Sequence, residues 1–480
     1  MAVRRRRAKI IATLGPASDD PAVLRDLVRA GVDVVRINFS HGQLADHQAR
    51  VTRIREAAQA CGRYVGILGD LSGPKIRIDR FIDGSVELKE GAQFILDVAM
   101  DPNAGTAAAV GCAYKALPQD VAAGVVLLLN DGLIVLKVTA VQGTQVITQV
   151  VTGGTLSNNK GLNRRGGGLS AGALTDKDRR DIEYAAQLGV DYLAVSFPKD
   201  AQDMAEARRL LRAAGSQALL MAKIERTEAI HHLDEIVLAS DAVMVARGDL
   251  GTEVGDAEIM GLQKRIIACA RLHNRPVVTA TQMMESMIHN PTPTRAEVSD
   301  VANAVLDGTD AVMLSAESAV GRYPVKAVEA MAEIIVGAEK YQLDSGEARR
   351  EQAADSVHET DRAIALAVMY TANHMDVEAI VALTETGSTA LWMSRIRSDL
   401  PIYAFTRNEQ TRNRVTLFRG VYPVAFDVTH TAPEILFPTI FRHMLDLQLC
   451  APLDRIILTL GEFTGQQGGT NTLKILQVQV

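Results

Sequence analysis

Short apolar runs alternate with amphipathic stretches along the first 70 residues. The apolar runs at residues 9–13, 34–38 and 64–69 predict strands, and the stretches at residues 21–30 and 44–61 predict helices. The alternation resumes after residue 175, with strand-length apolar runs at residues 192–196, 219–224, 242–246, 277–280 and 311–314. Almost continuously apolar runs fit parallel strands covered on both faces. The pattern therefore predicts a (β/α)8 TIM barrel, whose active site would lie at the carboxyl ends of the strands.

Residues 74–160 interrupt this pattern with short apolar segments of a different kind. They are joined by turn signals at Asn130-Asp131-Gly132 and at Gly143, which are typical of hairpins. We expect a small β-barrel lid domain inserted after the third barrel strand, with hinges at Gly73-Pro74 and at residues 160–168. The segments predicted as strands are residues 86–88, 94–96, 125–129, 133–138 and 146–151.

A polar stretch at residues 344–359 predicts a linker to a third region of alternating strands and helices. A helix is expected at residues 361–375 and strands at residues 378–383, 402–405, 422–426, 456–460 and 473–478. This region predicts an open α/β regulatory domain. The expected boundaries are residues 1–73 and 161–342 for the barrel, 74–160 for the β lid domain, and 343–480 for the carboxyl-terminal domain.

Composition and charge narrow the possible partners. The net charge is −6, and the basic run at residues 4–7 is not followed by an apolar segment typical of a signal peptide. The longest aliphatic run, residues 125–129, is too short to span a bilayer. We therefore expect a cytoplasmic protein with no nucleic-acid or membrane partner. The four cysteines lie far apart and form no C-x-x-C pair, so their spacing suggests neither a disulfide framework nor a zinc site.

Charged residues gather where neighbouring strands are predicted to end. Lys223 and Glu225 are two residues apart and therefore face the same side of a strand, while Asp249 and Thr281 end the next two strands. Carboxylates with a nearby ammonium suit Mg²⁺ and a transferring phosphoryl group. The structural alternative is a simple ion pair between Lys223 and Glu225, with Asp249 capping a helix.

A second polar set follows the second and third strands. Arg36, Asn38 and Ser40 share one face, and Asp70 ends the third strand beside them. Oxygen ligands beside an arginine suit a cation near a phosphate. An ordinary strand-to-loop turn is the alternative interpretation. Because the sequence contains neither a Walker A motif nor a dinucleotide fingerprint, phosphate would be held by side chains and metal.

Seven motifs together resemble the signatures of the pyruvate kinase family. Two of them are Arg36-Ile37-Asn38-Phe39-Ser40-His41-Gly42 and Ala280-Thr281-Gln282-Met283-Met284-Glu285-Ser286. The others lie at residues 9–18, 73–77, 221–225, 245–251 and 313–317, in the order that the family shows. The resemblance covers essentially the whole chain, and it implies the same division into barrel, lid and regulatory domain.

The resemblance implies transfer of a phosphoryl group from phosphoenolpyruvate to ADP, with Mg²⁺ or Mn²⁺ held by Glu225 and Asp249. It assigns substrate binding to Arg36, Lys223, Gly248, Asp249 and Thr281. The residues implied in catalysis are Lys223, Thr281, Arg36, Ser315 and Glu317, and those implied in binding the nucleotide are Asn38, His41, Arg77 and Lys160.

One position separates this chain from the better-known branch of the family, whose members require K⁺. The pocket for that ion corresponds to Asn38, Ser40, Asp70 and Leu71, and those members carry glutamate where Lys75 stands here. An ammonium at this place can supply the positive charge of K⁺. Leu71 and Ile78 also resemble the branch that works without K⁺, so we expect K⁺-independent activity.

A loop in the carboxyl-terminal domain is the expected allosteric site. Its residues, Thr384, Glu385, Thr386, Gly387, Ser388 and Thr389, join a strand to a helix and offer hydroxyls and amides to an anion. Ordinary helix capping is the alternative. In the family this loop binds an activating sugar phosphate, over which residues 461–470 would close. Residues 461–463 lack the clamp of bisphosphate-responsive animal forms, so a sugar monophosphate or AMP is the expected effector, and a homotetramer is the expected assembly.

Two other functions compete with this interpretation. Another metal-dependent barrel enzyme, such as an aldolase, could use Lys223, Glu225 and Asp249 in a similar way. A sugar-phosphate sensor that lacks enzymatic activity would use only the carboxyl-terminal domain. The sensor hypothesis leaves the charged rim of the barrel without a purpose, and it predicts no requirement for Mg²⁺.

Overall fold

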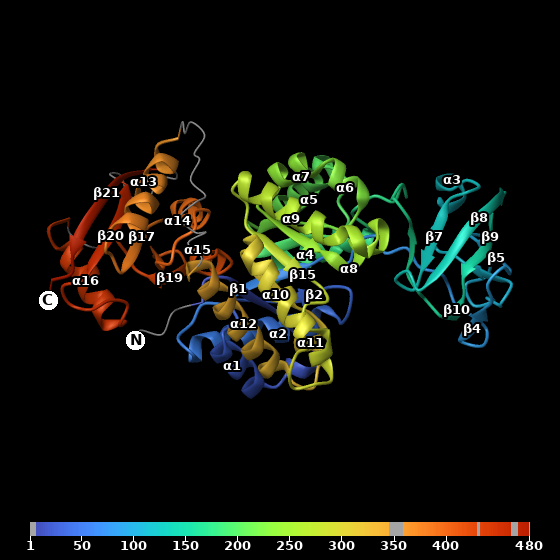
Figure 1. Cartoon of the computed structure of the whole chain (residues 1–480), viewed down its shortest axis with the longest axis horizontal. Helices are drawn as coiled ribbons and strands as arrows, with labels where there is room; N and C mark the ends of the chain where they lie inside the picture. Colours follow the sequence, from blue (N-terminus) through green and yellow to red (C-terminus); the bar gives the residue numbers. More distant parts are fainter. Residues whose placement is uncertain (1–5, 345–358, 430–432, 462–468, 480) are drawn as a thin grey trace.

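A computed structural model describes residues 6–344, 359–429, 433–461 and 469–479. Figure 1 shows three parts in a row, with the barrel in the middle, the inserted β domain at one end and the carboxyl-terminal domain at the other. The predicted linker falls mostly on residues 345–358, which lie outside the described residues, as do the first two positions of the basic run. None of the described helices is long and apolar enough to cross a membrane.

Eight parallel strands close the central barrel, as the sequence predicts. Their order around the barrel is β1-β16-β15-β14-β13-β12-β3-β2. The strands are β1 (Lys9–Thr13), β2 (Val34–Asn38), β3 (Gly66–Asp70), β12 (Tyr192–Val195), β13 (Leu219–Ile224), β14 (Ala242–Ala246), β15 (Val277–Ala280) and β16 (Ala311–Leu314). The third strand differs from the expected residues 64–69, because it begins at Gly66 and includes Asp70.

Helices cover the outside of the barrel. They are α1 (Pro21–Ala30), α2 (Leu44–Ala60), α4 (Asp176–Leu188), α5 (Ala201–Ala213), α6 (Thr227–His231), α7 (Leu233–Ala239), α8 (Arg247–Val254), α9 (Asp256–Leu272), α10 (Arg295–Asp307), α11 (Ala316–Ala319) and α12 (Pro324–Asp344). Local signals fix several ends: Thr175 and Asp178 form a capping box at the start of α4, and Gly189 ends it with a φ of 63°.

Aspartates anchor the lower end of the barrel, where the strands begin. Asp33, Asp191, Asp241 and Asp310 each stand just before a strand, and each accepts a hydrogen bond of 2.8 to 2.9 Å from a backbone amide of the neighbouring strand. Each also pairs with an arginine, namely Arg6, Arg55, Arg208 and Arg395 respectively. The repeated Asp before an apolar run in the sequence is therefore a structural device that joins adjacent strands.

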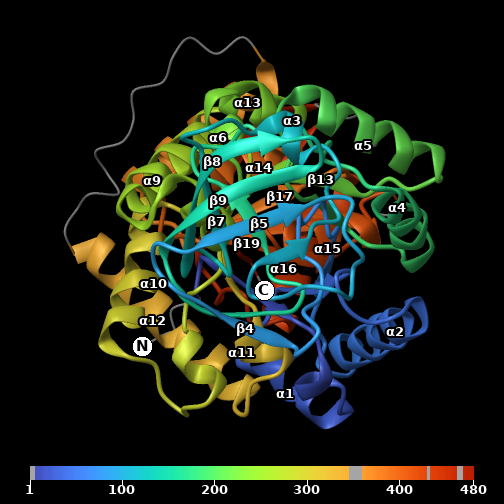
Figure 2. The ribbon, with the colours of Figure 1, turned by 90° about the vertical axis from the view of Figure 1, so that its right-hand side faces the viewer.

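The inserted domain leaves the barrel after β3 and lies in front of it in Figure 2. Its six-stranded sheet has the order β11-β7-β8-β9-β5-β6, and β10 pairs with β4 beside it. The elements are β4 (Ser85–Leu88), β5 (Gln93–Asp97), β6 (Ala109–Gly111), α3 (Leu117–Asp120), β7 (Val126–Leu129), β8 (Ile134–Gln142), β9 (Gln145–Thr152), β10 (Gly154–Ser157) and β11 (Leu162–Arg164). The sequence prediction missed β6, β10 and β11, which are short and carry weak alternation.

The two predicted hinges differ in structure. Gly73 has a φ of 67°, and a Cβ atom there would lie 2.7 Å from the Cβ of Ser196, so glycine is needed at this position. The other hinge, residues 160–168, contains β11, which pairs with β7 of the inserted sheet. The domain boundaries themselves stay a prediction.

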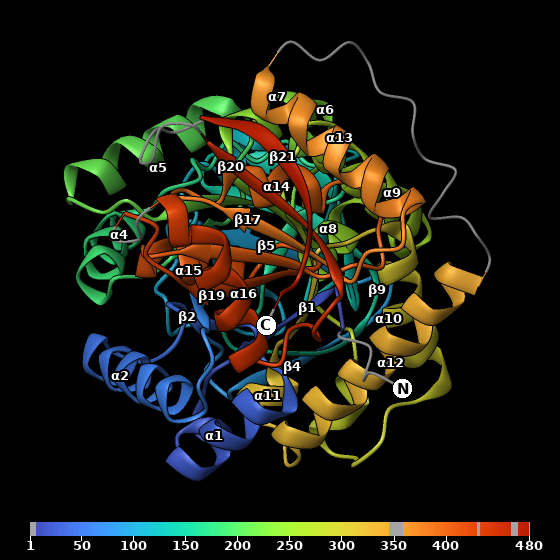
Figure 3. The ribbon, with the colours of Figure 1, turned by 90° about the vertical axis from the view of Figure 1, so that its left-hand side faces the viewer.

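The carboxyl-terminal domain covers the opposite end of the barrel, as the view in Figure 3 shows. Its sheet has the order β19-β18-β17-β20-β21, in which only the edge strand β21 is antiparallel. The elements are α13 (Thr360–His374), β17 (Ala379–Leu383), α14 (Ser388–Ser394), β18 (Ile402–Thr406), α15 (Glu409–Val415), β19 (Val421–Ala425), α16 (Leu436–Asp446), β20 (Arg455–Gly461) and β21 (Thr470–Gln477). Contacts such as Lys9 Nζ to Val421 O, at 2.7 Å, join this domain to the lower end of the barrel.

Candidate active site

Four charged side chains form one connected cluster at the carboxyl ends of β2, β3 and β13. The Lys223 ammonium lies 2.9 Å from Glu225 Oε1 and 3.3 Å from Asp70 Oδ1. The other Asp70 oxygen accepts a hydrogen bond of 2.6 Å from Arg36 Nε. The structure thus brings together two cations and two carboxylates that are separated by up to 189 positions in the chain.

Burial gives this cluster its electrostatic character. Asp70 and Glu225 are buried, with 0% and 1% of their surface exposed. Burial raises the pKa of Glu225. For Asp70, the cost of burial is outweighed by Lys223 and Arg36, which hold the pKa of its carboxyl below the usual value. Burial by itself would lower the pKa of Lys223, but the charges of Asp70 and Glu225 raise it above the usual value, so the side chain is an ammonium at neutral pH.

Two residues at the end of β12 hold the cluster in place, and the sequence interpretation gave them no role. The Ser196 hydroxyl accepts a hydrogen bond of 2.7 Å from Lys223 Nζ and donates to the Leu71 carbonyl at 2.7 Å. The Phe197 amide donates to Glu225 Oε2 at 2.9 Å, with a backbone φ of 56° at Phe197. Their place at the end of a barrel strand was the one signal available in the sequence.

Asp249 approaches the same site from the first turn of α8. Besides the larger effect of burial, the negative charge of Asp249 also raises the pKa of Glu225. Lys75, from the first hinge of the inserted domain, places its ammonium 3.3 Å from Asp249 Oδ1. The set offers only oxygen atoms to a metal, and one carboxylate is partly exposed, so the residues fit a hard divalent ion such as Mg²⁺ or Mn²⁺.

Thr281 and Gly248 contact each other directly. The Gly248 amide donates a hydrogen bond of 2.8 Å to Thr281 Oγ1, whose own proton is donated to the Ala280 carbonyl at 2.7 Å. Thr281 has a φ of 66°, a conformation that costs a non-glycine residue free energy and is frequent at functional sites. In this arrangement the Thr281 hydroxyl accepts the hydrogen bond of the Gly248 amide, and the resemblance assigns Gly248 to substrate binding.

Arg247 supports this strained turn. Its guanidinium donates to the Thr281 carbonyl at 2.8 Å and to the Gln282 carbonyl at 3.2 Å. The same group pairs with Asp300 at 2.7 Å. Arg247 therefore holds the backbone of Thr281 in position. This role was not apparent from the sequence, because its partner Asp300 lies on another helix, far away in the chain.

Ser315 and Glu317 lie together where β16 leads into α11. Both oxygens of the buried Glu317 are engaged by backbone amides, at 2.7 Å from Ser315 N and 3.2 Å from Met284 N. Burial raises the pKa of Glu317. The Ser315 hydroxyl is buried and has no hydrogen-bond partner within the described part of the chain. Glu317 thus fixes two loops of the rim, and the Ser315 hydroxyl is available to another group.

A cavity of about 210 Å³ separates the rim of the barrel from the inserted domain. Lys75, Arg77 and Lys160 line it from the two hinges, and Asp249 lines it from α8. Two of the four residues expected at the nucleotide, Arg77 and Lys160, are therefore brought together here. Asn38 and His41 lie instead at the end of β2 and in the exposed turn that follows it.

The sequence interpretation gave no role in the site to several further polar residues that line this cavity. Arg226 lines it, and its guanidinium lies 5.5 Å from the centre of the Phe197 ring. Glu253 is buried, which raises its pKa to about 7, and its carboxylate accepts a hydrogen bond of 2.9 Å from the Thr227 amide. Asp131, Asn163 and Glu228 also line the cavity. Their spacing along the chain follows no motif, so only the fold reveals them.

Three of the four residues in the expected K⁺ pocket, Asn38, Asp70 and Leu71, have oxygen atoms that contact other groups of the protein. Asn38 Oδ1 accepts a hydrogen bond of 3.0 Å from the Ser40 amide, and the Leu71 carbonyl accepts from Ser196. Asp70 pairs with Arg36 and Lys223. The structure places the Lys75 ammonium against Asp249, close to the expected divalent metal, where the sequence interpretation had placed it in the pocket for K⁺.

The expected allosteric loop borders a separate cavity of about 90 Å³ in the carboxyl-terminal domain. Gly387, with a φ of 86°, turns the chain into α14, and its amide donates to Thr384 Oγ1 at 2.9 Å. Arg407, which the sequence interpretation missed, adds a cation to the lining and pairs with Glu385 at 3.3 Å. The lining residues from the loop are Thr384, Glu385, Thr386, Ser388 and Thr389. Residues 462–468 of the expected closing loop lie outside the described residues.

A (β/α)8 barrel with a partly buried ammonium, an arginine and acidic groups at its rim fits an enzyme of the phosphotransferase class. Comparison with known proteins gives the family. The family model "Pyruvate kinase, barrel domain" matches residues 5–328, and "Pyruvate kinase, alpha/beta domain" matches residues 362–476. The chain belongs to the pyruvate kinase family.

Individual relatives agree with this assignment. The chain is 52% identical over the whole of both chains to "Pyruvate kinase II" of Salmonella typhimurium. It is 53% identical to a pyruvate kinase of Haemophilus influenzae, over 88% of this chain and 89% of that protein. A crystal structure of a pyruvate kinase from Cryptosporidium parvum superposes with a TM-score of 0.92 at 32% identity, covering 98% of this chain and 96% of the other.

Proposed function

We propose that the chain transfers the phosphoryl group of phosphoenolpyruvate to ADP, which yields ATP and the enolate of pyruvate, and that the enolate is then protonated to pyruvate. The observation that carries this proposal is the partly buried Lys223 ammonium, held between Asp70 and Glu225 at the mouth of the barrel. A coupled assay of pyruvate formation, in which Mg²⁺, monovalent cations and effectors are varied independently, tests the proposal. An aldolase-like barrel enzyme would form no ATP in this assay.

The proposed roles follow from the charges at the rim. Lys223 and Arg36 offer positive charge to the phosphoryl oxygens, which carry most of the charge in a loose transition state. Glu225 and Asp249 would hold Mg²⁺, which when bound supplies Lewis-acid stabilisation of the substrate's carboxylate and phosphate oxygens. The donor set of these two residues supports the assignment, because it contains carboxylate oxygens alone.

Substrate binding requires a small rearrangement at Gly248. Its amide now donates to Thr281 Oγ1, so a substrate carboxylate that accepts from Gly248 would release the threonine hydroxyl. The hydroxyl proton, which is now donated to the Ala280 carbonyl, would then turn toward the enolate and be passed to it. Ser315, whose buried hydroxyl has no partner in the described structure, and Glu317 would complete the proton relay.

For the nucleotide, we propose that Arg77 and Lys160 bind the phosphates in the cavity between barrel and inserted domain. Both cations line this cavity together with Lys75. Asn38 and His41 are proposed to join when the inserted domain moves over the rim, because they lie on the same end of the barrel. Glycine-hinged closure of this kind excludes water from the site during transfer.

Activity without K⁺ is an expected property of this chain. Because the Lys75 ammonium adds positive charge beside Asp249, the rate in a buffer that contains only bulky organic cations should match the rate with K⁺. Reversing the charge in Lys75→Glu should lower the K⁺-free rate by about 10-fold or more, equivalent to about 1.4 kcal/mol in the barrier. Added K⁺ should restore part of this loss.

The matched control for this experiment is Lys89→Glu, since Lys89 is exposed in the inserted domain. This variant should keep the wild-type response to K⁺. Collapse of wild-type turnover in K⁺-free buffer would contradict the prediction.

We propose that a sugar monophosphate or AMP activates the enzyme at the loop of residues 384–389. The cavity beside this loop contains hydroxyls and the Arg407 guanidinium, which together suit one phosphate group. The double variant Thr386→Ala, Ser388→Ala should raise the activator concentration for half-maximal effect by about 10-fold, the loss expected when hydrogen bonds to a charged group are removed. The rate at saturating phosphoenolpyruvate should stay the same.

Thr371→Ala is the control for the effector experiment, because that hydroxyl donates to Ala367 O within α13. Initial rates with ribose, glucose and fructose monophosphates, AMP and fructose 1,6-bisphosphate, each added alone, provide the measurement. Activation by the bisphosphate alone would reverse the proposed specificity. The resemblance to the family also supports a homotetrameric assembly and a cytoplasmic location as proposals.

A further inference from the structure

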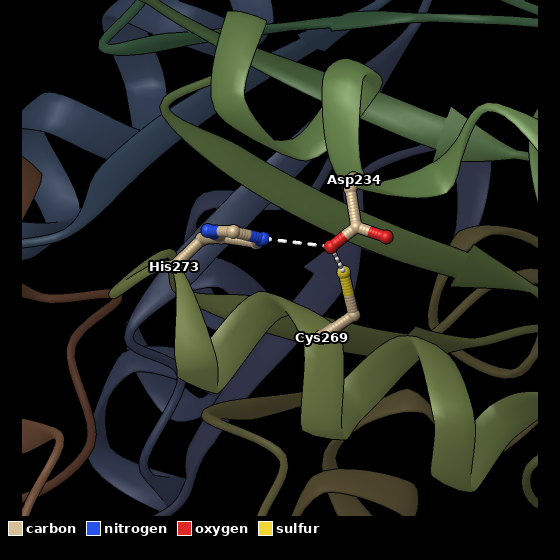
Figure 4. Close-up of side chains that lie close together, drawn as sticks. All are labelled: Asp234, Cys269 and His273. Atoms are coloured by element: carbon tan, nitrogen blue, oxygen red, sulfur yellow. Dashed lines mark hydrogen bonds and ion pairs between the residues drawn. The ribbon is translucent and has the colours of Figure 1, made fainter. Parts of the chain in front are cut away.

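A second group of ligand atoms lies on the outside of the barrel, between α7 and α9. His273 Nε2 lies 2.8 Å from Asp234 Oδ1, and Cys269 Sγ lies 3.6 Å from the same oxygen. Figure 4 shows the three side chains pointing toward one another from two helices. Cys269 belongs to α9, His273 ends that helix four residues later, and Asp234 lies in the first turn of α7. The spacing of four residues puts the cysteine and the histidine on one helix face.

The geometry is close to that of a tetrahedral metal site. Ligand bonds of about 2.0 to 2.3 Å around zinc place nitrogen and oxygen ligands about 3.3 Å apart, and sulfur and oxygen ligands about 3.5 Å apart. The observed sulfur-to-oxygen distance of 3.6 Å agrees with this arrangement, and the nitrogen-to-oxygen distance of 2.8 Å requires a shift of about half an ångström. All three ligand atoms lie within 4.8 Å of one another.

The site is also accessible to an ion from solvent. The Asp234 side chain is 71% exposed, His273 is 22% exposed, and Cys269 is partly buried. Because most of the Asp234 side chain is exposed, the required movement of half an ångström can come from this residue. Among the residues that the structure describes, no other group of three histidine, cysteine or acidic side chains meets in this way.

A simpler account treats the group as a His–Asp ion pair with a thiol nearby. This account explains the 2.8 Å contact, but exposed ion pairs contribute little to stability, typically about 0 to 1 kcal/mol. A hydrogen bond from the Cys269 thiol accounts for the sulfur contact with the same oxygen, but a thiol is a weak donor, so this contact adds little stability. The combination of one sulfur, one nitrogen and one oxygen ligand is characteristic of zinc.

We propose that Asp234, Cys269 and His273 bind one Zn²⁺ ion, with water as the fourth ligand. The site differs in chemistry from the Mg²⁺ site at the rim, because sulfur and imidazole ligands favour zinc over a hard ion. Burial raises the pKa of the Cys269 thiol to about 11, so the metal must displace its proton to solvent on binding. The inference is independent of the proposed catalytic roles.

A bound ion would connect α7 and α9, two helices that follow the strands β13 and β14. The helix α7 follows β13, which carries Lys223 and Glu225, and α9 follows the helix that carries Asp249. Because the ion binds the folded protein and the ligands separate on unfolding, Zn²⁺ should raise the temperature of thermal unfolding.

Cobalt is a suitable spectroscopic probe, because Co²⁺ occupies zinc sites and gives a near-ultraviolet charge-transfer band only when a thiolate is a ligand. The full-length protein should be titrated with Co²⁺ in excess Mg²⁺, which keeps the rim site filled. We expect the band to saturate at one equivalent of Co²⁺ and to disappear when Zn²⁺ is added. Isothermal titration with Zn²⁺ alone gives the affinity.

Three variants test the individual ligands: Cys269→Ala, His273→Ala and Asp234→Asn. Cys269→Ala should abolish the charge-transfer band, and each variant should weaken Zn²⁺ binding by more than about 100-fold, beyond the effect typical of outer-shell partners. Cys61→Ala and His289→Ala are matched controls, because Cys61 faces the Arg25 carbonyl and His289 is exposed on another loop.

The unfolding temperature without metal shows whether each variant is folded. A wild-type protein without the band, or a Cys269→Ala variant that binds Zn²⁺ as tightly as the wild type, would overturn the proposal. Equal loss of binding in Cys61→Ala would do the same, since it would place the metal elsewhere.

Discussion

Replacing Lys223 with methionine is expected to lower kcat by about 10³-fold or more, which corresponds to about 4 kcal/mol in the barrier. The ammonium is the cation of the rim that contacts both buried carboxylates, at 2.9 Å and 3.3 Å. Methionine fills a similar volume but cannot neutralise charge on the phosphoryl oxygens. Pyruvate formation measured at saturating substrates and Mg²⁺ gives the effect.

The variant also leaves Glu225 without its cation, which can cost about 3 to 5 kcal/mol of stability. Asp70 keeps its hydrogen bond from Arg36, and the raised pKa of Glu225 allows it to take up a proton, so we expect a folded protein. Circular dichroism and thermal unfolding check this point. Lys264→Met is the control, because Lys264 is 60% exposed and pairs with Asp307 away from the rim. Near-normal turnover in a folded Lys223→Met protein would refute the assignment.

The substitution Glu225→Gln should raise the Mg²⁺ concentration for half-maximal rate by about 100-fold, because one of the two proposed carboxylate ligands loses its charge. It should also lower kcat on the order of 10²-fold, since a metal that stabilises the transition state contributes several kcal/mol. Glutamine keeps the shape of the side chain and an oxygen for the Phe197 amide, but its NH2 group would then face the Lys223 ammonium, so thermal unfolding must show that the variant is folded.

Titration of the pyruvate-forming rate with Mg²⁺ and with Mn²⁺ measures the effect of Glu225→Gln, and removal of the metal with a chelator should abolish the wild-type rate. Glu87→Gln is the matched control, because Glu87 is exposed on β4 and accepts from Thr155 at 2.7 Å. An unchanged half-saturating Mg²⁺ concentration in Glu225→Gln would exclude this residue as a ligand.

The lower and upper ends of the barrel use charge for different purposes. At the lower end, aspartates such as Asp310 and Asp191 accept hydrogen bonds from backbone amides and pair with arginines, so their charges stabilise the fold. At the upper end, Lys223 and Asp249 keep exposed surface from which a ligand can be reached. Because the stabilising contacts lie at the lower end, residues at the upper rim can change without loss of the fold.

Several features of the molecule were determined by the sequence itself. Strands such as β13 and β14 were predicted to the residue, because a strand covered on both faces is almost continuously apolar, and such a run is visible locally. The two-residue period of a strand also predicted that Lys223 and Glu225 lie on the same face. The short strands β6 and β10 escaped prediction because three or four partly exposed residues carry little pattern.

The partners of these side chains were decided only by the tertiary structure. The contact of Lys75 with Asp249, the support of Thr281 by Arg247, and the meeting of Asp234 with Cys269 and His273 all join distant parts of the chain. The cysteine spacing in the sequence suggested no zinc site, because it compares cysteines only with their near neighbours, whereas the proposed group also draws a ligand from α7. Local patterns encode strands and helices, but the distance between two side chains depends on how those elements pack.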